Sequence, residues 1–393
     1  MCSSDLDSIT NPPVAVDPDE YFSQSAFRVV YQTNNFLLPQ LRDLIKNGDV
    51  LNIRPEYQRR LRWTNPQKSK LIESLLLNIP VPPVFFYEAE EARYEVMDGQ
   101  QRLNAIKEYF EGDFALSTLN VLSPLNGMRY GKLPPKVKRA LDRASLSAIV
   151  LLTESDKEIG EESKKSQVDI RRFIFDRLNT GGRKLNPQEL RNAIYPGNFN
   201  QLIVKMARRR EFTDVFGIPP YTEAEPNDYY ENLARQKNAL YSAMGDCQLV
   251  LRFFALRDAE NIRGSMKSML DRAMETRMGC SEEQADEARS DFESRFDVAV
   301  AVFGPEPFRL LADERGHRRM SAGLYDSSLV AIDRLWEHRA KIAASSTAIR
   351  DALTVELKDE AQIPLLTGKT STASSVKLRL ELMESIIRKG AEL

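Results

Sequence analysis

The chain has 393 residues, of which 42% are hydrophobic and 28% charged, which is typical of a globular protein and excludes a disordered or fibrous one. Its formal net charge of −2 excludes a polycation that coats nucleic acid, so any nucleic-acid contact has to be local. Three scattered cysteines do not make a disulfide framework, and no secretory leader or run of about 18 apolar residues is present, so we expect a cytoplasmic protein.

Residues 1–20 contain Asn11-Pro12-Pro13 and alternating Asp and Pro, and they show no helical or strand periodicity. This composition predicts a flexible leader. Apolar residues at helical spacing then predict a helix over 37–45, and the sequence Asn-Gly-Asp at 47–49 should end it. A short extended piece is expected over 50–53.

The next helix should start at Asn65 and Pro66 and end at Pro80, because apolar residues recur at helical spacing between them. Two β-rich runs follow at 84–87 and 94–97, separated by an acidic turn. Their spacing predicts one hairpin.

The second run leads into Asp98-Gly99-Gln100-Gln101-Arg102 and then into a helix that Gly112 should end. A turn from a strand into a helix leaves the first helical N–H groups unpaired, with the positive end of the helix dipole behind them, and phosphate binds well there.

Each residue of the pentapeptide suits that chemistry. Gly99 would let the backbone approach a ligand, Gln100 and Gln101 offer amide donors, and Arg102 offers a planar fork for phosphate oxygens. Asp98 is placed to hold a divalent ion such as Mg²⁺ or to orient an attacking water. The alternative is an ordinary Asp-Gly turn in which the arginine pairs with a carboxylate.

A second candidate lies in segment 175–190. Asn186, Pro187 and Glu189 follow the pattern of a helix start, which by itself indicates no ligand. The loop before them is richer in phosphate donors than a helix connection needs, although a plain connection remains the alternative. Its candidate ligand-binding residues are Asn179, Thr180, Gly181, Gly182 and Arg183.

From about residue 156 the pattern is almost wholly helical. We therefore expect an α+β protein, with an α/β domain over 21–155 and a helical domain over 156–393 that contributes the Asn-Thr-Gly-Gly loop. Lys205 with Arg208 to Arg210 forms a local basic cluster, which we interpret as a solvated helix face.

Four segments carry a family resemblance. They occur in the order seen in the N-terminal domain of GmrSD-type restriction enzymes, also called domain of unknown function 262, and are 53–59 with Trp63, 71–74, 98–102 and 179–190. Stretches 246–255 and 319–326 look like the helical continuation of that family, so the resemblance covers roughly residues 30–385.

The family is similar in turn to ParB and sulfiredoxin, whose shared fold binds nucleotide on a strand, a Gly-x-x-Arg turn and a helix. The resemblance thus implies a ParB/sulfiredoxin-like domain, with ATP or GTP and Mg²⁺ as cofactors. It implies that Asn179 joins Asp98 at the metal and that Gln58 and Arg59 approach the nucleotide from the opposite side. The alternative for 57–63 is core packing by the aromatic residues.

The resemblance implies a nucleoside triphosphatase of a DNA-restriction or phage-defence system that regulates DNA recognition or an effector. The alternatives are a non-catalytic nucleotide-gated regulator, antitoxin-like, and a direct DNA-nicking nuclease. Relatives often carry a histidine-rich nuclease module, whereas this chain has only His317 and His338, which we expect to be ordinary surface or helix residues. The expected partners are DNA, a separately encoded effector or nuclease and a second copy of the chain, and no membrane.

Overall fold

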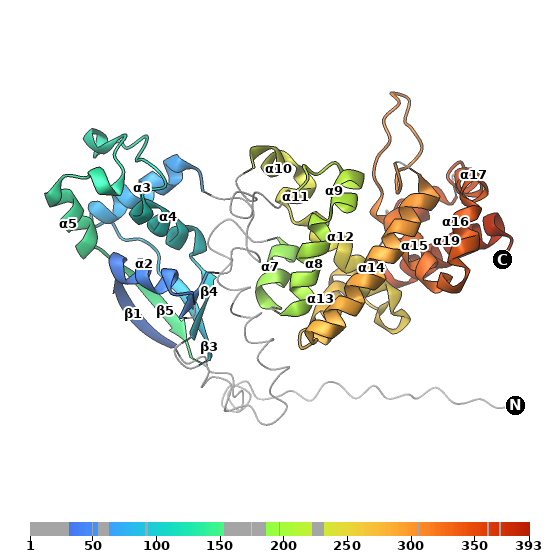
Figure 1. Cartoon of the computed structure of the whole chain (residues 1–393), viewed down its shortest axis with the longest axis horizontal. Coiled ribbons are helices and arrows are strands. Elements are labelled where there is room, and N and C mark those ends of the chain that lie inside the picture. Colours follow the sequence, from blue (N-terminus) through green and yellow to red (C-terminus); the bar gives the residue numbers. More distant parts are fainter. Residues whose placement is uncertain are drawn as a thin grey trace, which may run out of the picture. The chain divides into compact units, whose positions relative to one another are not determined.

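The computed structural model describes residues 31–48, 50–53, 63–90, 93–152, 174, 186–195, 197–221, 232–304, 306–359, 361–368 and 371–393. The chain divides into two compact units (Figure 1). Unit 1 is Met1–Ile53 with Asn65–Ile170, and unit 2 is Arg54–Thr64 with Arg171–Leu393. The predicted leader lies outside the described residues, and the domain boundaries expected from the sequence stay predictions.

Unit 1 holds a five-stranded mixed sheet of order β1-β5-β3-β4-β2. The parallel pairs are β3 with β5 and β2 with β4, and the other pairs are antiparallel. Alternating buried residues of β5 and β3 supply the centre of the sheet. The strands are β1 (Tyr31–Leu37), β2 (Leu51–Asn52), β3 (Val84–Glu90), β4 (Arg93–Asp98) and β5 (Ser145–Leu151).

The predicted hairpin and the predicted helices of this unit are confirmed. β3 and β4 pair antiparallel, and three helices form within a few residues of the expected positions. α2 packs against α4 and α5, and α3 packs against the same two helices. The helices are α2 (Leu38–Lys46), α3 (Asn65–Leu76), α4 (Gln100–Glu111) and α5 (Pro135–Arg143), with the 3-10 turns η1 (Ser123–Leu125) and η2 (Tyr130–Lys132) before α5.

The described part of unit 2 is helical. Its helices are α7 (Pro187–Ile194), α8 (Asn198–Arg208), α9 (Arg210–Phe216), α10 (Leu233–Lys237), α11 (Ala239–Ser242), α12 (Gly245–Arg257), α13 (Met266–Thr276), α14 (Glu282–Phe303), α15 (Ala322–Arg334), α16 (Arg339–Ala344), α17 (Ser346–Glu356), α18 (Ile363–Leu366) and α19 (Ala373–Ala391). Short 3-10 turns η4 (Ala259–Asn261) and η5 (Trp336–His338) join some of them. The mixed sheet and the helical remainder confirm the α+β class.

Two helices of unit 2, α12 and α15, are buried on nearly every side and pack against each other. A buried ion pair joins them, in which the Nε of Arg252 lies 2.7 Å from Oδ1 of Asp326. α12 contains stretch 246–255, and stretch 319–326 ends in the first turns of α15; the sequence linked both stretches to the family resemblance. Among the described residues, no helix is long and apolar enough to cross a membrane.

Candidate functional site

The predicted strand, turn and helix are present at the centre of unit 1. β4 ends at Asp98, Gly99 adopts the left-handed conformation with φ of 98°, and α4 begins at Gln100. The carbonyl of Gly99 accepts the first helical bond, from the N–H of Leu103 at 3.0 Å. The N-terminal amides of α4 therefore start directly after the strand, as the sequence predicts.

Gly99 is required by packing as well as by its backbone conformation. A Cβ at this position would lie 2.3 Å from Cγ1 of Val84 on β3, closer than any real contact. The residue is buried, and the space beside its Cα is filled by the neighbouring strand. The glycine therefore lets α4 start close against β3. Its expected role in the approach of the backbone to a ligand stays a prediction.

Arg102 uses its guanidinium to hold its own chain. Nη2 donates to Oδ2 of Asp98 at 2.6 Å, and Nη1 donates to the carbonyls of Pro82 and, at 3.0 Å, of Pro83. The Arg102 side chain is 12% exposed and that of Asp98 is 54% exposed. The pairing with a carboxylate is the one that the ordinary-turn alternative describes.

The two glutamines of the turn differ in exposure. Gln100 is 6% exposed, whereas Gln101 is half-buried. Both take part in contacts of their own. Gln101 is thus the more accessible of the two amide side chains, and Asp98 is the most accessible group of the whole turn.

The sequence did not predict the role of the Pro82 and Pro83 carbonyls. Two consecutive prolines supply carbonyl oxygens without N–H groups, and the backbone before β3 turns these oxygens toward α4. The signal was present as the Val-Pro-Pro run, but the partner lies 19 residues away at Arg102. Local pattern reasoning does not reach such a contact.

Several candidate residues lie outside the described residues. They are Gln58, Arg59, Asn179, Thr180, Gly181, Gly182 and Arg183. Whether they approach Asp98 stays a prediction.

The predicted helix start at Asn186 is confirmed. The side chain of Asn186 accepts from the N–H groups of Gln188 and Glu189, and the carboxylate of Glu189 accepts from the N–H of Asn186. Trp63 is half-buried.

Among the described residues, no group of three or more His, Cys, Asp or Glu side chains is arranged to hold a metal ion. His317 lies in an exposed loop near Asp313, and His338 ends the turn η5. Asp98 is an oxygen ligand of the kind that Mg²⁺ prefers, and the expected second ligand is Asn179, outside the described residues.

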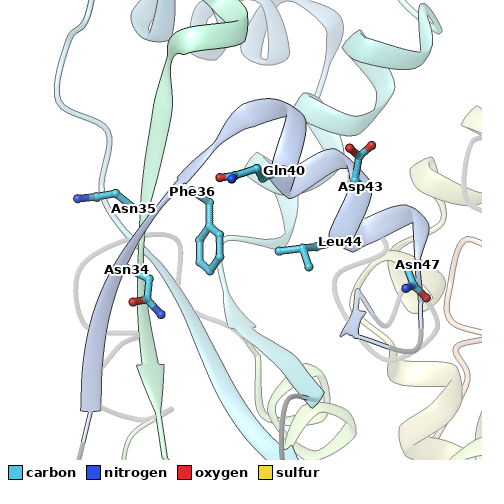
Figure 2. A pocket seen from close by; sticks show the side chains of 7 residues that line it. All are labelled: Asn34, Asn35, Phe36, Gln40, Asp43, Leu44 and Asn47. Carbon is cyan, nitrogen blue, oxygen red and sulfur yellow. The ribbon is translucent and has the colours of Figure 1, made fainter.

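A groove on another part of unit 1 has different chemistry (Figure 2). Its volume is about 680 Å³, and it lies along β1 and α2. In the sheet, β5 and β3 separate β1 from β4, the strand that ends at Asp98. Phe36 and Leu44 point toward each other in it (Figure 2). Carboxamides and one carboxylate make up its polar lining, without lysine or arginine, so its charge does not suit a triphosphate. The lining residues are Asn34, Asn35, Phe36, Gln40, Asp43, Leu44 and Asn47.

Residues 40–196 match the family model of the GmrSD restriction endonuclease, N-terminal domain. The GmrSD N-terminal match confirms the resemblance over those residues, and it contains the whole Asp98–Arg102 turn and helix α7. Extension of the resemblance into the later helices stays a prediction. The search of curated proteins and the search of solved structures each returned no match.

Proposed function

We propose that this chain is a component of a DNA-restriction or phage-defence system and that its N-terminal domain binds a nucleoside triphosphate, ATP or GTP, with Mg²⁺. The observation that carries the proposal is the GmrSD N-terminal match over residues 40–196, within which a strand, a left-handed glycine and a helix N-terminus follow one another. The domain would use the nucleotide to control DNA recognition or a separate effector.

The Asp98–Arg102 ion pair supports a specific way of binding. The two side chains neutralise each other at 2.6 Å, and the carboxylate is still 54% exposed. Asp98 would hold Mg²⁺ while Arg102 would donate to phosphate, so both charges would keep an opposite partner. When bound, the metal ion neutralises phosphate charge. The remaining phosphate donors would be the α4 amides with Gln101 and the predicted loop at 179–183.

Hydrolysis is the first candidate activity. Asp98 and Asn179 would then serve the metal and orient the attacking water. Phosphate release from each of the four nucleoside triphosphates, measured with Mg²⁺ and with or without DNA, tests this. We expect the unchanged chain to release phosphate and the Asp98→Asn variant to lose this activity. No phosphate release from any triphosphate in any condition would reject hydrolysis.

Binding without hydrolysis is the second candidate, and the same ion pair favours it. A carboxylate held by a guanidinium is occupied, so it is less available to orient water. In that case the nucleotide shifts a conformational equilibrium by binding alone. Equal affinity for a triphosphate and its slowly hydrolysed analogue, together with no phosphate release, distinguishes this regulator from the enzyme.

A further inference from the structure

A basic segment of unit 1 covers η2 and α5, the latter labelled in Figure 1, and it includes none of the motifs that the sequence singled out. Residues 129–143 contain six basic side chains and a single acidic one, in a chain whose net charge is −2. The basic residues are Arg129, Lys132, Lys136, Lys138, Arg139 and Arg143. The chain as a whole is slightly acidic, but this local excess of positive charge can attract an anion.

Elsewhere in the described chain, arginines commonly meet carboxylates, as Arg209 meets Asp297 at 2.8 Å. Over 129–143 the pattern differs. The only acidic residue, Asp142, accepts a 2.7 Å bond from the hydroxyl of Tyr130, and Lys138 lies over the Tyr130 ring. Across the described residues, none of the six basic side chains forms an ion pair.

Three of these side chains share one face of α5. Lys136, Arg139 and Arg143 are spaced i, i+3 and i+7, and all three are exposed. At 1.5 Å per residue they form a row about 10 Å long. Lys132, also exposed, precedes the row in η2. Such a row of basic side chains can contact several negatively charged groups that follow one another along a ligand.

The first turn of α5 adds a second indication. It contains Lys136 and Lys138 and no acidic residue, and no side chain caps it. The positive end of the helix dipole disfavours cations there, so the arrangement costs stability by itself. An anion at this end would interact favourably with the dipole, with the first amides and with both lysines.

The platform beneath the row is well packed. The Tyr130 ring lies 4.5 Å from that of Phe110 and 6.2 Å from that of Tyr109 on α4. In the loop before η2, the N–H of Leu116 donates to the carbonyl of Met128, and the carbonyl of Leu116 accepts from the N–H of Gly127. The row is therefore held on a rigid support, which lowers the entropy cost of binding.

We propose that Lys132, Lys136, Arg139 and Arg143 bind the phosphate backbone of double-stranded DNA. The choice of DNA rests on the proposed restriction role, whereas the anion preference rests on the charges alone. Lysine and arginine contacts to phosphate position a protein on DNA without reading bases, so this surface binds duplexes of any sequence.

Fluorescence anisotropy of a labelled duplex of about 30 base pairs, titrated with the full chain over a range of salt concentrations without nucleotide, tests the proposal. The triple variant K136E/R139E/R143E should bind at least about tenfold more weakly, and its slope of log K against log salt should be smaller by about 3. The matched control K205E/K237E/K377E has the same change in net charge on exposed lysines of unit 2 and should bind as the unchanged chain does.

Equal affinity of the unchanged chain and the K136E/R139E/R143E variant for the duplex would overturn the proposal. So would equal weakening in the control, or binding to vesicles of anionic lipid in place of the duplex. Thermal unfolding of both variants checks that these exposed changes leave the fold intact. The K136E/R139E/R143E variant should also keep triphosphate binding, so failure of the nucleotide proposal and failure of the DNA surface are separate results.

Discussion

At the scale of single residues, Gly99 determines whether β4 and α4 can join. We predict that Gly99→Ala lowers the free energy of unfolding by about 2–5 kcal/mol, because φ is positive and the new Cβ would collide with Val84. Urea denaturation followed by circular dichroism measures this. The control is Gly48→Ala, where a Cβ meets no atom within 4 Å, with an expected change below about 0.5 kcal/mol. Equal effects of the two changes would contradict the packing role.

Tyr130 gives a prediction on pH. Burial, followed by the hydrogen bond to Asp142, raises the pKa of the Tyr130 phenol from 10.0 to about 12. A group with a raised pKa in the folded state contributes stability below pH 10, and this contribution is lost as the pH rises from 10 toward 12. Tyr130→Phe should therefore cost about 1 kcal/mol at neutral pH.

The difference in unfolding free energy between the unchanged chain and Tyr130→Phe should then shrink as the pH rises through this window. Urea denaturation at several pH values measures it. A difference that stays constant up to pH 12 would show that the Tyr130 proton has no part in stability.

The residues of the turn show how far sequence reasoning reaches. The strand end, the glycine turn and the helix start at Asp98 to Gln100 follow from local patterns and are confirmed. The pairing of Arg102 with a carboxylate is the one that the ordinary-turn alternative describes. Its contacts with the Pro82 and Pro83 carbonyls were not predicted, because these carbonyls come from a distant part of the chain. Arg102 was expected to face a ligand, and in the structure its guanidinium also joins the start of α4 to Asp98 and to the backbone before β3.

At the scale of elements, the sequence predicted α2, β2, α3, β3, β4 and α4 of unit 1, but not β1, β5 or α5. β5 alternates buried and less buried residues, a signal that was there to find. β1 is an edge strand that contains two consecutive asparagines, which are depleted in strands, and all seven of its residues pair with β5. Pairing between strands more than a hundred residues apart is a tertiary effect that a local window does not contain.

The basic cluster at the end of α8 also differs from the solvated helix face that we expected. Arg209 makes a bidentate pair with Asp297 of α14, at 2.9 and 2.8 Å, and Arg210 is exposed near Asp214. Part of the cluster thus joins two helices. Its partner is remote in sequence, as it is for Arg102.

A buried ion pair joins helices α12 and α15. We predict that Asp326→Asn destabilises the protein by about 3–5 kcal/mol, because it leaves Arg252 buried without its carboxylate, beside the buried Arg379. Asp297→Asn breaks the more exposed pair with Arg209 and should cost about 1 kcal/mol or less. Thermal unfolding of both variants measures the contrast. Similar losses would show that burial does not decide the strength of these pairs.

At the scale of the whole molecule, the family match crosses the division between the two units. Residues 40–196 include the sheet and turn of unit 1 and helix α7 of unit 2. The candidate phosphate loop at 179–183 belongs to the sequence of the second unit, whereas Asp98 belongs to the first. Both segments lie within the matched range, so the variants of the nucleotide proposal are tested in the full chain.

The most direct test of the nucleotide proposal is calorimetric titration of the full chain with ATP and with GTP in the presence of Mg²⁺. We predict saturable binding of one of them, and at least about tenfold weaker binding by Asp98→Asn. The control is Glu111→Gln, which removes an exposed carboxylate at the C-terminal end of α4 and should leave the affinity for nucleotide unchanged. No heat with either nucleotide, or binding that Asp98→Asn does not alter, would contradict it.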